Sequence, residues 1–331
     1  MKKQLQMALL MGALLGLGFN APAQAAKKAH HGKTAVKKAH GKKAPAHAGA
    51  TRAGKHTVAA LDARKHVHKA ALQDWEPGRL ALYSASALVI DQTTGQAIVD
   101  KHSDVVTPIA SISKLMTAMV VLDARLDLQE VIAIGEEDVD GLKGTRSRLP
   151  VGTTMTRETA MLLALMSSEN RAAHALGRHY PGGMPAFVAA MNQKARALGM
   201  NSSNFEEPTG LSSNNVSTAN DLAKMVMAAA RYPEIRNFST TAGARIDLNG
   251  RLRDFNTTNP LVKSDQWEIG VSKTGYISEA GRCLVMQARV ADKPVVIVLL
   301  DSVGKMTRVG DANRIKRWME SASLPHERKS A

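Results

Sequence analysis

The stretch Pro108-Ile-Ala-Ser-Ile-Ser-Lys-Leu-Met-Thr-Ala-Met-Val-Val-Leu-Asp-Ala-Arg125 decides the fold of this 331-residue chain. Drawn as a helix, it is apolar on nearly every side, which is typical of a helix at the centre of a domain. We therefore expect a buried helix over Ser111–Arg125, with the other elements arranged around it. Ser111 and Lys114 lie three residues apart at its start, so their side chains share one helix face.

Apolar runs on both sides of this helix predict the remaining elements. Strands are expected at residues 83–91, 96–101, 268–276, 282–290 and 295–301, and further helices at 157–167, 185–198, 219–231 and 311–321. Short turns join neighbouring strands, so these can pair antiparallel, whereas parallel pairing needs a crossover. The predicted fold class is α/β (α+β), with a mostly antiparallel five-stranded sheet, helices on both faces and an all-helical insertion. Both ends of one domain, residues 77–322, build the sheet.

Ser111 and Lys114 are a candidate nucleophile and base. A serine hydroxyl attacks efficiently only when a base takes its proton, and a neutral lysine can do so. Free lysine has a pKa near 10.4, so only on the order of one in a thousand is neutral at pH 7. Burial and a neighbouring cation, here Lys273, would both lower that pKa. The alternative is a capping serine beside a solvent-exposed lysine, which the apolar neighbours Ile112 and Leu115 disfavour. At a helix amino terminus, the Ser111 N–H can also face an oxyanion.

Ser168-Glu-Asn170 follows the second buried helix and is predicted to form a turn. Ser168 can relay a proton to a leaving nitrogen, and the Asn170 amide can bind a substrate peptide group. Three other Ser-x-Asn strings have the same spacing, at residues 202–204, 212–214 and 213–215. Those strings lie in polar, turn-rich sequence, whereas a rigid buried helix delivers Ser168, so Ser168 is preferred.

Lys273-Thr274-Gly275 ends the first strand of the carboxyl-terminal meander. Gly275 leaves room for a ligand backbone beside the strand, and Lys273 and Thr274 offer a cation and a hydroxyl to a carboxylate. Taken alone, the tripeptide is an ordinary strand end. Together the three strings supply a hydroxyl nucleophile, two amines, a second hydroxyl and a carboxamide, which can build an acyl-enzyme without a metal or cofactor.

These strings, in this order, resemble the signature of the low-molecular-mass penicillin-binding proteins, the serine D-alanyl-D-alanine peptidases. The chain looks closest to the D-alanyl-D-alanine endopeptidases of the penicillin-binding-protein-seven type. Leu165-Met-Ser-Ser-Glu-Asn-Arg-Ala172, Tyr180-Pro-Gly-Gly183 and Glu207-Pro-Thr-Gly-Leu211 add to the resemblance, which covers roughly residues 81–321. It implies the β-lactamase/transpeptidase-like fold.

The resemblance also implies an activity and a role for each site residue. The enzyme would be a hydrolase that cleaves peptide cross-links of peptidoglycan through an acyl-serine intermediate and is inhibited by β-lactams. The implied roles are Ser111 as nucleophile, Lys114 as general base, Ser168 as proton shuttle, Asn170, Lys273, Thr274 and Gly275 in substrate binding, and the N–H groups of Ser111 and Tyr276 as the oxyanion hole.

Three other functions compete with this one. A D-alanyl-D-alanine carboxypeptidase uses the same motifs. A β-lactamase needs rapid deacylation, for which Glu206 and Glu207 are the nearest candidate carboxylates. A non-catalytic wall-binding protein would act through its basic segment. Carboxypeptidase relatives often add a β-rich domain and a membrane anchor at the carboxyl end, whereas here only a short tail, 323–331, follows the last helix, so we expect the shorter endopeptidase type.

The first 25 residues have the pattern of an export signal. Lys2 and Lys3 form a basic start, Met7–Phe19 is apolar but short for a bilayer span, and Ala23-Gln-Ala25 fits a cleavage site. A retained membrane anchor is the less favoured alternative. No other segment resembles a transmembrane helix, so we expect a soluble periplasmic product. Cys283 is the only cysteine, and its apolar setting predicts a small buried residue in a strand rather than a reactive thiol.

Most of the net charge of +15 lies in a low-complexity segment. Residues 26–69 hold 12 Lys or Arg, one acidic residue and seven of the 11 histidines, and residues 70–331 carry only +2. With almost nothing apolar to bury, residues 26–76 are predicted to be a disordered linker. Adhesion of residues 26–70 to an anionic polymer or a membrane surface is the second interpretation, and metal capture by the histidines the third. This distribution argues against a specific nucleic-acid partner.

Overall fold

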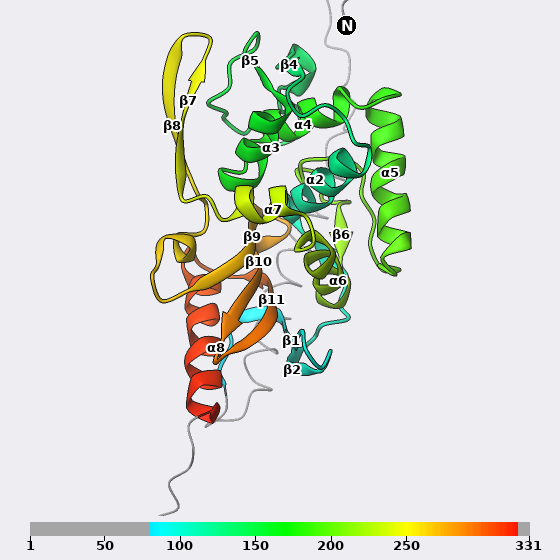
Figure 1. Cartoon of the computed structure of the whole chain (residues 1–331). Helices are drawn as coiled ribbons and strands as arrows, with labels where there is room; N and C mark the ends of the chain where they lie inside the picture. Colours follow the sequence, from blue (N-terminus) through cyan, green and yellow to red (C-terminus); the bar gives the residue numbers. More distant parts are fainter. Residues whose placement is uncertain (1–79, 324–331) are drawn as a thin grey trace, which may run out of the picture. The chain divides into compact units, whose positions relative to one another are not determined.

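A five-stranded sheet joins the two ends of the described chain (Figure 1). The computed structural model describes residues 80–323. The strand order is β2-β1-β11-β10-β9, and every neighbouring pair is antiparallel. The strands are β1 (Ser84–Asp91), β2 (Ala97–Lys101), β9 (Glu268–Ile277), β10 (Gly281–Val290) and β11 (Lys293–Ser302). All five predicted strands are confirmed within two residues at either end.

Helices cover both faces of this sheet, because successive strand residues point to opposite sides and both sides are apolar. Helix α8 (Thr307–Ser323) packs on one face through Val309, Ala312 and Ile315. Helix α6 (Ala219–Ala229) contacts β1, β10 and β11 on the other face. The predicted architecture of helices on both sides is therefore confirmed, and the last helix begins four residues earlier than the predicted Asp311.

The central helix α2 (Ser113–Asp123) lies within the helical part of the domain (Figure 1). Nine of its eleven residues are buried, which confirms the expectation of an apolar centre. Around it lie α3 (Arg157–Met166), α4 (Asn170–Arg178), α5 (Gly183–Ala197), α6 and α7 (Pro233–Ser239). The predicted start at Ser111 is wrong by two residues, because residues Ala110–Ile112 form a separate 3₁₀ turn, η1.

Several smaller elements were not predicted. They are β3 (Thr107–Pro108) with β6 (Val216–Ser217), β4 (Val131–Ala133) with β5 (Thr154–Thr156), the hairpin β7 (Gly243–Leu248) and β8 (Arg251–Asn256), the turns η2 (Glu136–Asp138) and η3 (Pro260–Lys263), and helices α4 and α7. The β7–β8 hairpin extends beside α3 (Figure 1).

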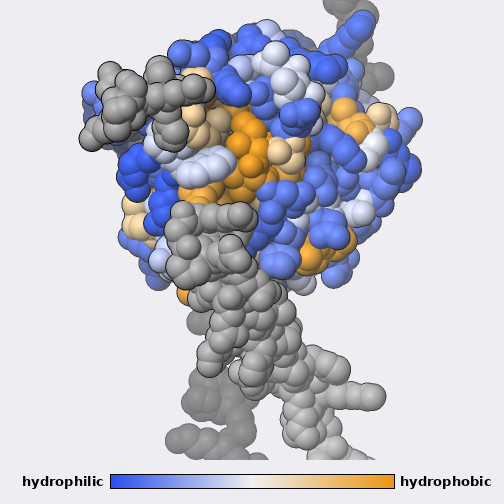
Figure 2. Space-filling view, turned by 90° about the horizontal axis from the view of Figure 1, so that it is seen from below, coloured by the Kyte–Doolittle hydropathy of each residue, from blue (hydrophilic) through white to orange (hydrophobic). Residues whose placement is uncertain are grey.

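Seen from below, the visible described surface is mostly hydrophilic, with a hydrophobic area near the centre of the view and smaller ones toward the right (Figure 2). No helix within residues 80–323 is long and apolar enough to cross a membrane. The predicted signal peptide, the basic linker and all but the first residue of the predicted tail lie outside the described residues.

Candidate active site

Ser111 lies where a strained backbone and two glycines bring three segments together. The preceding Ala110 has φ +50, a left-handed conformation that is unusual for a residue with a side chain and often occurs at functional sites. A Cβ on Gly210 would lie 1.8 Å from the Ala110 carbonyl oxygen, and one on Gly275 would lie 2.8 Å from the Ile109 carbonyl oxygen. Only glycine permits this approach, so η1 is held between the 207–212 turn and strand β9.

The Lys114 ammonium group is directed at Ser111 by two carbonyl oxygens. Lys114 is fully buried, and its Nζ lies 2.8 Å from Ser111 Oγ, 2.7 Å from Asn170 Oδ1 and 2.6 Å from the Thr209 carbonyl oxygen. The two carbonyl oxygens can only accept hydrogen bonds. When Lys114 is neutral, its two N–H groups therefore satisfy Asn170 and Thr209, and its lone pair points at the Ser111 hydroxyl.

Burial lowers the pKa of Lys114 from 10.5 to about 7, although the carboxylates of Glu207 and Glu169 raise it in part. Burial also lowers the pKa of Lys273 well below its ordinary value, and the charges of Lys114 and Arg308 lower it further. The sequence predicts that Lys273 lowers the pKa of Lys114, but burial is what lowers it, and the charge effect between the two lysines acts on Lys273. A neutral amine beside Ser111 is accessible near pH 7.

Ser168 joins this site through Lys273, whose Nζ lies 2.9 Å from Ser168 Oγ and 3.0 Å from the Thr274 carbonyl oxygen. Ser168 lies between α3 and α4 with φ +63, a second strained position, and this turn was predicted. Lys273 is almost fully buried on β9. The arrangement links the Ser168 hydroxyl to the Lys273 amine.

Asn170 is the first residue of α4 rather than the end of a turn, which corrects the sequence interpretation. Its Oδ1 accepts from Lys114, and its Nδ2 donates to Thr145 Oγ1 at 3.0 Å. An amide nitrogen carries two hydrogens, so one donor remains for a ligand.

Strand β9 borders the site along its free edge. In the described residues, β10 is the only strand that pairs with β9. Thr274 is buried and donates to Thr258 Oγ1 at 2.6 Å, whereas Tyr276 is 56% exposed with its ring against the Arg282 guanidinium. An unpaired edge beside a nucleophile can accept an extended peptide as an added strand.

The rival serines have structural roles. Ser113 is fully buried, donates to the Ala110 carbonyl oxygen and accepts from Asn215 Nδ2. Ser212 donates its hydroxyl to Glu206 and accepts from Asn214 N within its own turn. These contacts support the choice of Ser111 and Ser168 over the other candidates, and they give Asn215 the task of holding the start of α2.

Sequence reasoning missed three contributors to the site. The Thr209 carbonyl is a backbone group and leaves no side-chain signal. Glu207 shapes the turn that presents it, by accepting from Thr209 N and Gly210 N, each at 2.6 Å. Arg308, on α8, donates to the carbonyl oxygens of Gly275 at 2.7 Å and Cys283 at 3.0 Å, and so supports the end of β9. The position of Arg308 next to the last predicted helix, which packs on the sheet, could have indicated this contact with β9.

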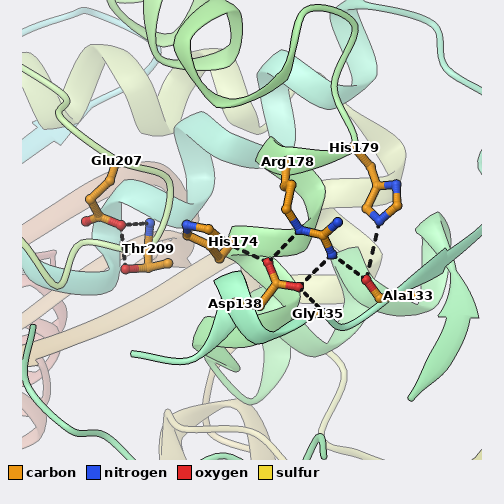
Figure 3. Close-up of polar contacts among 8 residues, drawn as sticks. All are labelled: Ala133, Gly135, Asp138, His174, Arg178, His179, Glu207 and Thr209. Atoms are coloured by element: carbon orange, nitrogen blue, oxygen red, sulfur yellow. Dashed lines mark hydrogen bonds and ion pairs between the residues drawn. The ribbon is translucent and has the colours of Figure 1, made fainter. Parts of the chain in front are cut away.

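A hollow of about 120 Å³ lies beside the site, lined in part by Asn170, Asp138, His174 and Thr209. Asp138 is buried and lies 2.7 Å from His174 Nδ1 and 2.8 Å from Arg178 Nη2 (Figure 3). His174 lies between this ion pair and the Glu207–Thr209 turn (Figure 3). Burial alone would raise the pKa of Asp138, but the hydrogen bonds from His174 and Arg178 lower it to about 2.

Comparison with known proteins gives concordant matches. Residues 72–304 match the family described as D-alanyl-D-alanine carboxypeptidase. The D-alanyl-D-alanine endopeptidase of Pseudomonas aeruginosa is 47% identical over 75% of this chain and 81% of its own length. The D-alanyl-D-alanine endopeptidase of Escherichia coli K12 is 48% identical over 73% and 78%. The crystal structure of the Streptomyces K15 DD-transpeptidase superposes with a TM-score of 0.67 at 26% identity, over 74% of this chain and 98% of that one.

Proposed function

This chain belongs to the D-alanyl-D-alanine carboxypeptidase family of serine peptidases, and we propose that it is an endopeptidase that cuts the D-alanyl cross-links of peptidoglycan. One observation carries the chemistry: the Nζ of a fully buried lysine lies 2.8 Å from Ser111 Oγ. The 47% and 48% identities to two endopeptidases favour the endopeptidase over the carboxypeptidase.

The reaction has two halves. Neutral Lys114 takes the hydroxyl proton as Ser111 Oγ bonds to the D-alanine carbonyl carbon. The C–N bond then breaks, and the leaving amine receives the proton by way of Ser168. A water molecule then attacks the ester carbonyl carbon as Lys114 takes its proton, and Lys114 returns that proton to Ser111 Oγ as the ester C–O bond breaks. The Ser111 and Tyr276 N–H groups stabilise the oxyanion in both halves.

Substrate binding uses the free edge of β9. The peptide stem lies along Lys273–Tyr276 as an added strand, and the remaining Asn170 N–H donates to a peptide carbonyl. Thr274 and the buried amine of Lys273 bind the carboxylate side of the substrate. β-Lactams, which mimic the D-alanyl-D-alanine bond, enter the same site and acylate Ser111.

Two alternatives remain distinguishable. A β-lactamase would need a carboxylate free to hold the deacylating water, but both oxygens of Glu207 already accept backbone hydrogen bonds, and Glu206 bonds to Ser212. This favours an enzyme that stays acylated by penicillin.

A protein that only binds the wall would act through residues 26–70. Deletion of these residues distinguishes it from the peptidase, because a wall-binding protein should then lose its function although Ser111 is intact.

An enzyme of this family acts where the cell wall lies, outside the cytoplasm. We assign this chain to the periplasm, which it reaches through a cleaved signal at residues 1–25. Adhesion of the basic residues 26–70 to an anionic polymer or membrane surface is part of the same proposal. Mass measurement should show that the mature protein begins at Ala26. Its binding to anionic vesicles should weaken as the salt concentration rises.

The test of the activity is digestion of purified peptidoglycan followed by mass analysis of the fragments. Cross-linked dimers should become monomers without loss of terminal D-alanine, and Ser111→Ala should leave the dimers intact. Release of free D-alanine alone would identify a carboxypeptidase and refute the endopeptidase.

A further inference from the structure

A loop at residues 139–148, which none of the three motifs includes, is fastened to the site at both ends. Before it, the buried Asp138 accepts from Arg178 Nε at 3.1 Å and Nη2 at 2.8 Å, on helix α4 (Figure 3). At its far end, the Glu169 carboxylate accepts from Ser147 Oγ at 2.7 Å and from Arg148 Nε at 2.9 Å. Glu169 directly precedes Asn170 at the start of α4, and Arg178 is the last residue of that helix, so the loop is fixed against both ends of α4.

Asp140 folds the interior of this loop. One carboxylate oxygen accepts from Leu142 N at 2.8 Å and Lys143 N at 2.9 Å. The other accepts from Thr145 N at 2.8 Å and from Thr145 Oγ1 at 2.6 Å. The carboxylate thereby fixes the backbone of Thr145 and takes the single hydroxyl proton of its side chain.

The direction of the next hydrogen bond follows from that proton. With its hydrogen committed to Asp140, the Thr145 hydroxyl offers only lone pairs to Asn170, 3.0 Å away. A side-chain amide can meet a lone pair only with its NH₂ group, so Nδ2 must face Thr145. The amide carbonyl must then face Lys114, where it accepts at 2.7 Å.

We propose that Asp140 and Thr145 are positioning residues, which set the orientation of the Asn170 amide and thereby the direction of the Lys114 lone pair toward Ser111. The inference rests on the proposed acyl-serine chemistry. Neither residue touches the reacting atoms, and each acts through Asn170.

Loss of the Thr145 oxygen would let the amide turn over. Its NH₂ group would then face Lys114, and the lone pair of the neutral lysine could accept from it instead of from Ser111. Acylation should slow about threefold to tenfold, the effect of losing one neutral hydrogen bond. Binding before acylation should also weaken, because the Asn170 N–H that donates to the substrate carbonyl turns away with the amide.

The pH dependence separates this role from a loop that merely unfolds. Lys114 is faced by the carboxylates of Glu207 and Glu169 and by the amine of Lys273, and none of these groups is altered by a change at Thr145. A turned amide no longer accepts from the ammonium, so the acid limb of the acylation profile should move to lower pH. An unfolded loop would admit water to Lys114 and move that limb to higher pH.

The experiment measures acylation of the full chain by a fluorescent penicillin, as a rate constant and an affinity, from pH 5.5 to 8.5. Thr145→Val removes the hydroxyl oxygen, and Thr145→Ser keeps it. Asp140→Asn puts an NH₂ group, which donates to the Thr145 hydroxyl, in place of the carboxylate oxygen that accepts from it. Thr94→Val is the matched control, because Thr94 is an exposed threonine in the β1–β2 turn that also accepts a hydrogen bond, from Gln96 N.

The expected result is slow acylation with Thr145→Val and Asp140→Asn, a limb moved to lower pH, and ordinary rates with Thr145→Ser and Thr94→Val. Equal rates for Thr145→Val and the unaltered chain would overturn the inference, as would equal slowing by Thr145→Ser or a limb moved to higher pH. Failure of the unaltered chain to label at all would instead refute the proposed function.

Discussion

Titration of Lys114 is the event on which both activity and stability depend. Burial lowers its pKa from 10.5 to about 7. At pH 7 about half of the folded molecules then carry the neutral amine, against roughly one in 3,000 for an ordinary lysine with that higher pKa. The shift corresponds to about 5 kcal/mol of preference for the uncharged form.

The acylation rate constant should follow this titration. Below pH 7 it should rise about tenfold per pH unit, and above pH 7 it should level off, because the neutral base is then saturated. The assay is the time course of labelling by a fluorescent penicillin between pH 5.5 and 8.5. A rate that keeps rising tenfold per unit to pH 8.5 would show a lysine with an ordinary pKa and refute the reasoning.

Stability gives an independent measure of the same pKa. Between about pH 7 and 10.5 the unfolded chain binds a proton at Lys114 that the folded chain has released, so wild-type stability rises with pH in this window. Lys114→Met removes the titration. The free energy of unfolding of wild type relative to Lys114→Met, from urea curves, should rise by about 1.4 kcal/mol per pH unit between pH 7.5 and 9.5. Parallel stability curves for the two proteins across that range would contradict the buried, titrating lysine.

Three further predictions concern residues around the site. Asp138→Asn should lower the free energy of unfolding at pH 7 by about 2 kcal/mol, because the hydrogen bonds that hold the pKa of Asp138 at about 2 are lost. This difference should shrink as the pH falls from 4 to 2 in urea titrations. Gly210→Ala should abolish labelling of Ser111 and lower the melting temperature, since its Cβ would lie 1.8 Å from a backbone oxygen at φ +81; full labelling would refute the close approach. Glu279→Gln, which breaks the partly exposed 2.5 Å ion pair with Lys143, should change the unfolding free energy by less than about 1 kcal/mol; a larger loss would show a desolvated pair.

The sheet could be predicted because its signals are local. The apolar strands at Ser84–Asp91 and Lys293–Ser302 are bounded by turn residues, and the short connections β1–β2, β9–β10 and β10–β11 allow only antiparallel pairing. The β7–β8 hairpin carried an equally local signal, Asn249-Gly250 with both residues at positive φ, which was overlooked. Its strands alternate between exposed and partly buried residues, and this pattern is weaker than that of the central strands.

The site was predicted as a set of residue types, and the structure brings these together. Ser111, Lys114 and Asn170 form one hydrogen-bonded group, and Lys273 joins Ser168 and Thr274 in a second. The catalytic roles of these residues and the oxyanion hole at Ser111 and Tyr276 remain predictions for the experiments above.

The groups that sequence could not supply act through backbone or long-range contacts. The Thr209 carbonyl reaches Lys114 across 95 positions, and its orientation depends on a glycine conformation at Gly210. Thr145 lies 25 positions from Asn170, in a loop without a motif. Such contacts follow from tertiary packing, which no local pattern encodes.

The most direct test of the central claim is intact-mass analysis after penicillin treatment, followed by peptide mapping. The account predicts one covalent adduct per chain, on Ser111, that is absent from Ser111→Ala and forms far more slowly in Lys114→Met. An adduct on another residue, or one that persists in Ser111→Ala, would contradict it.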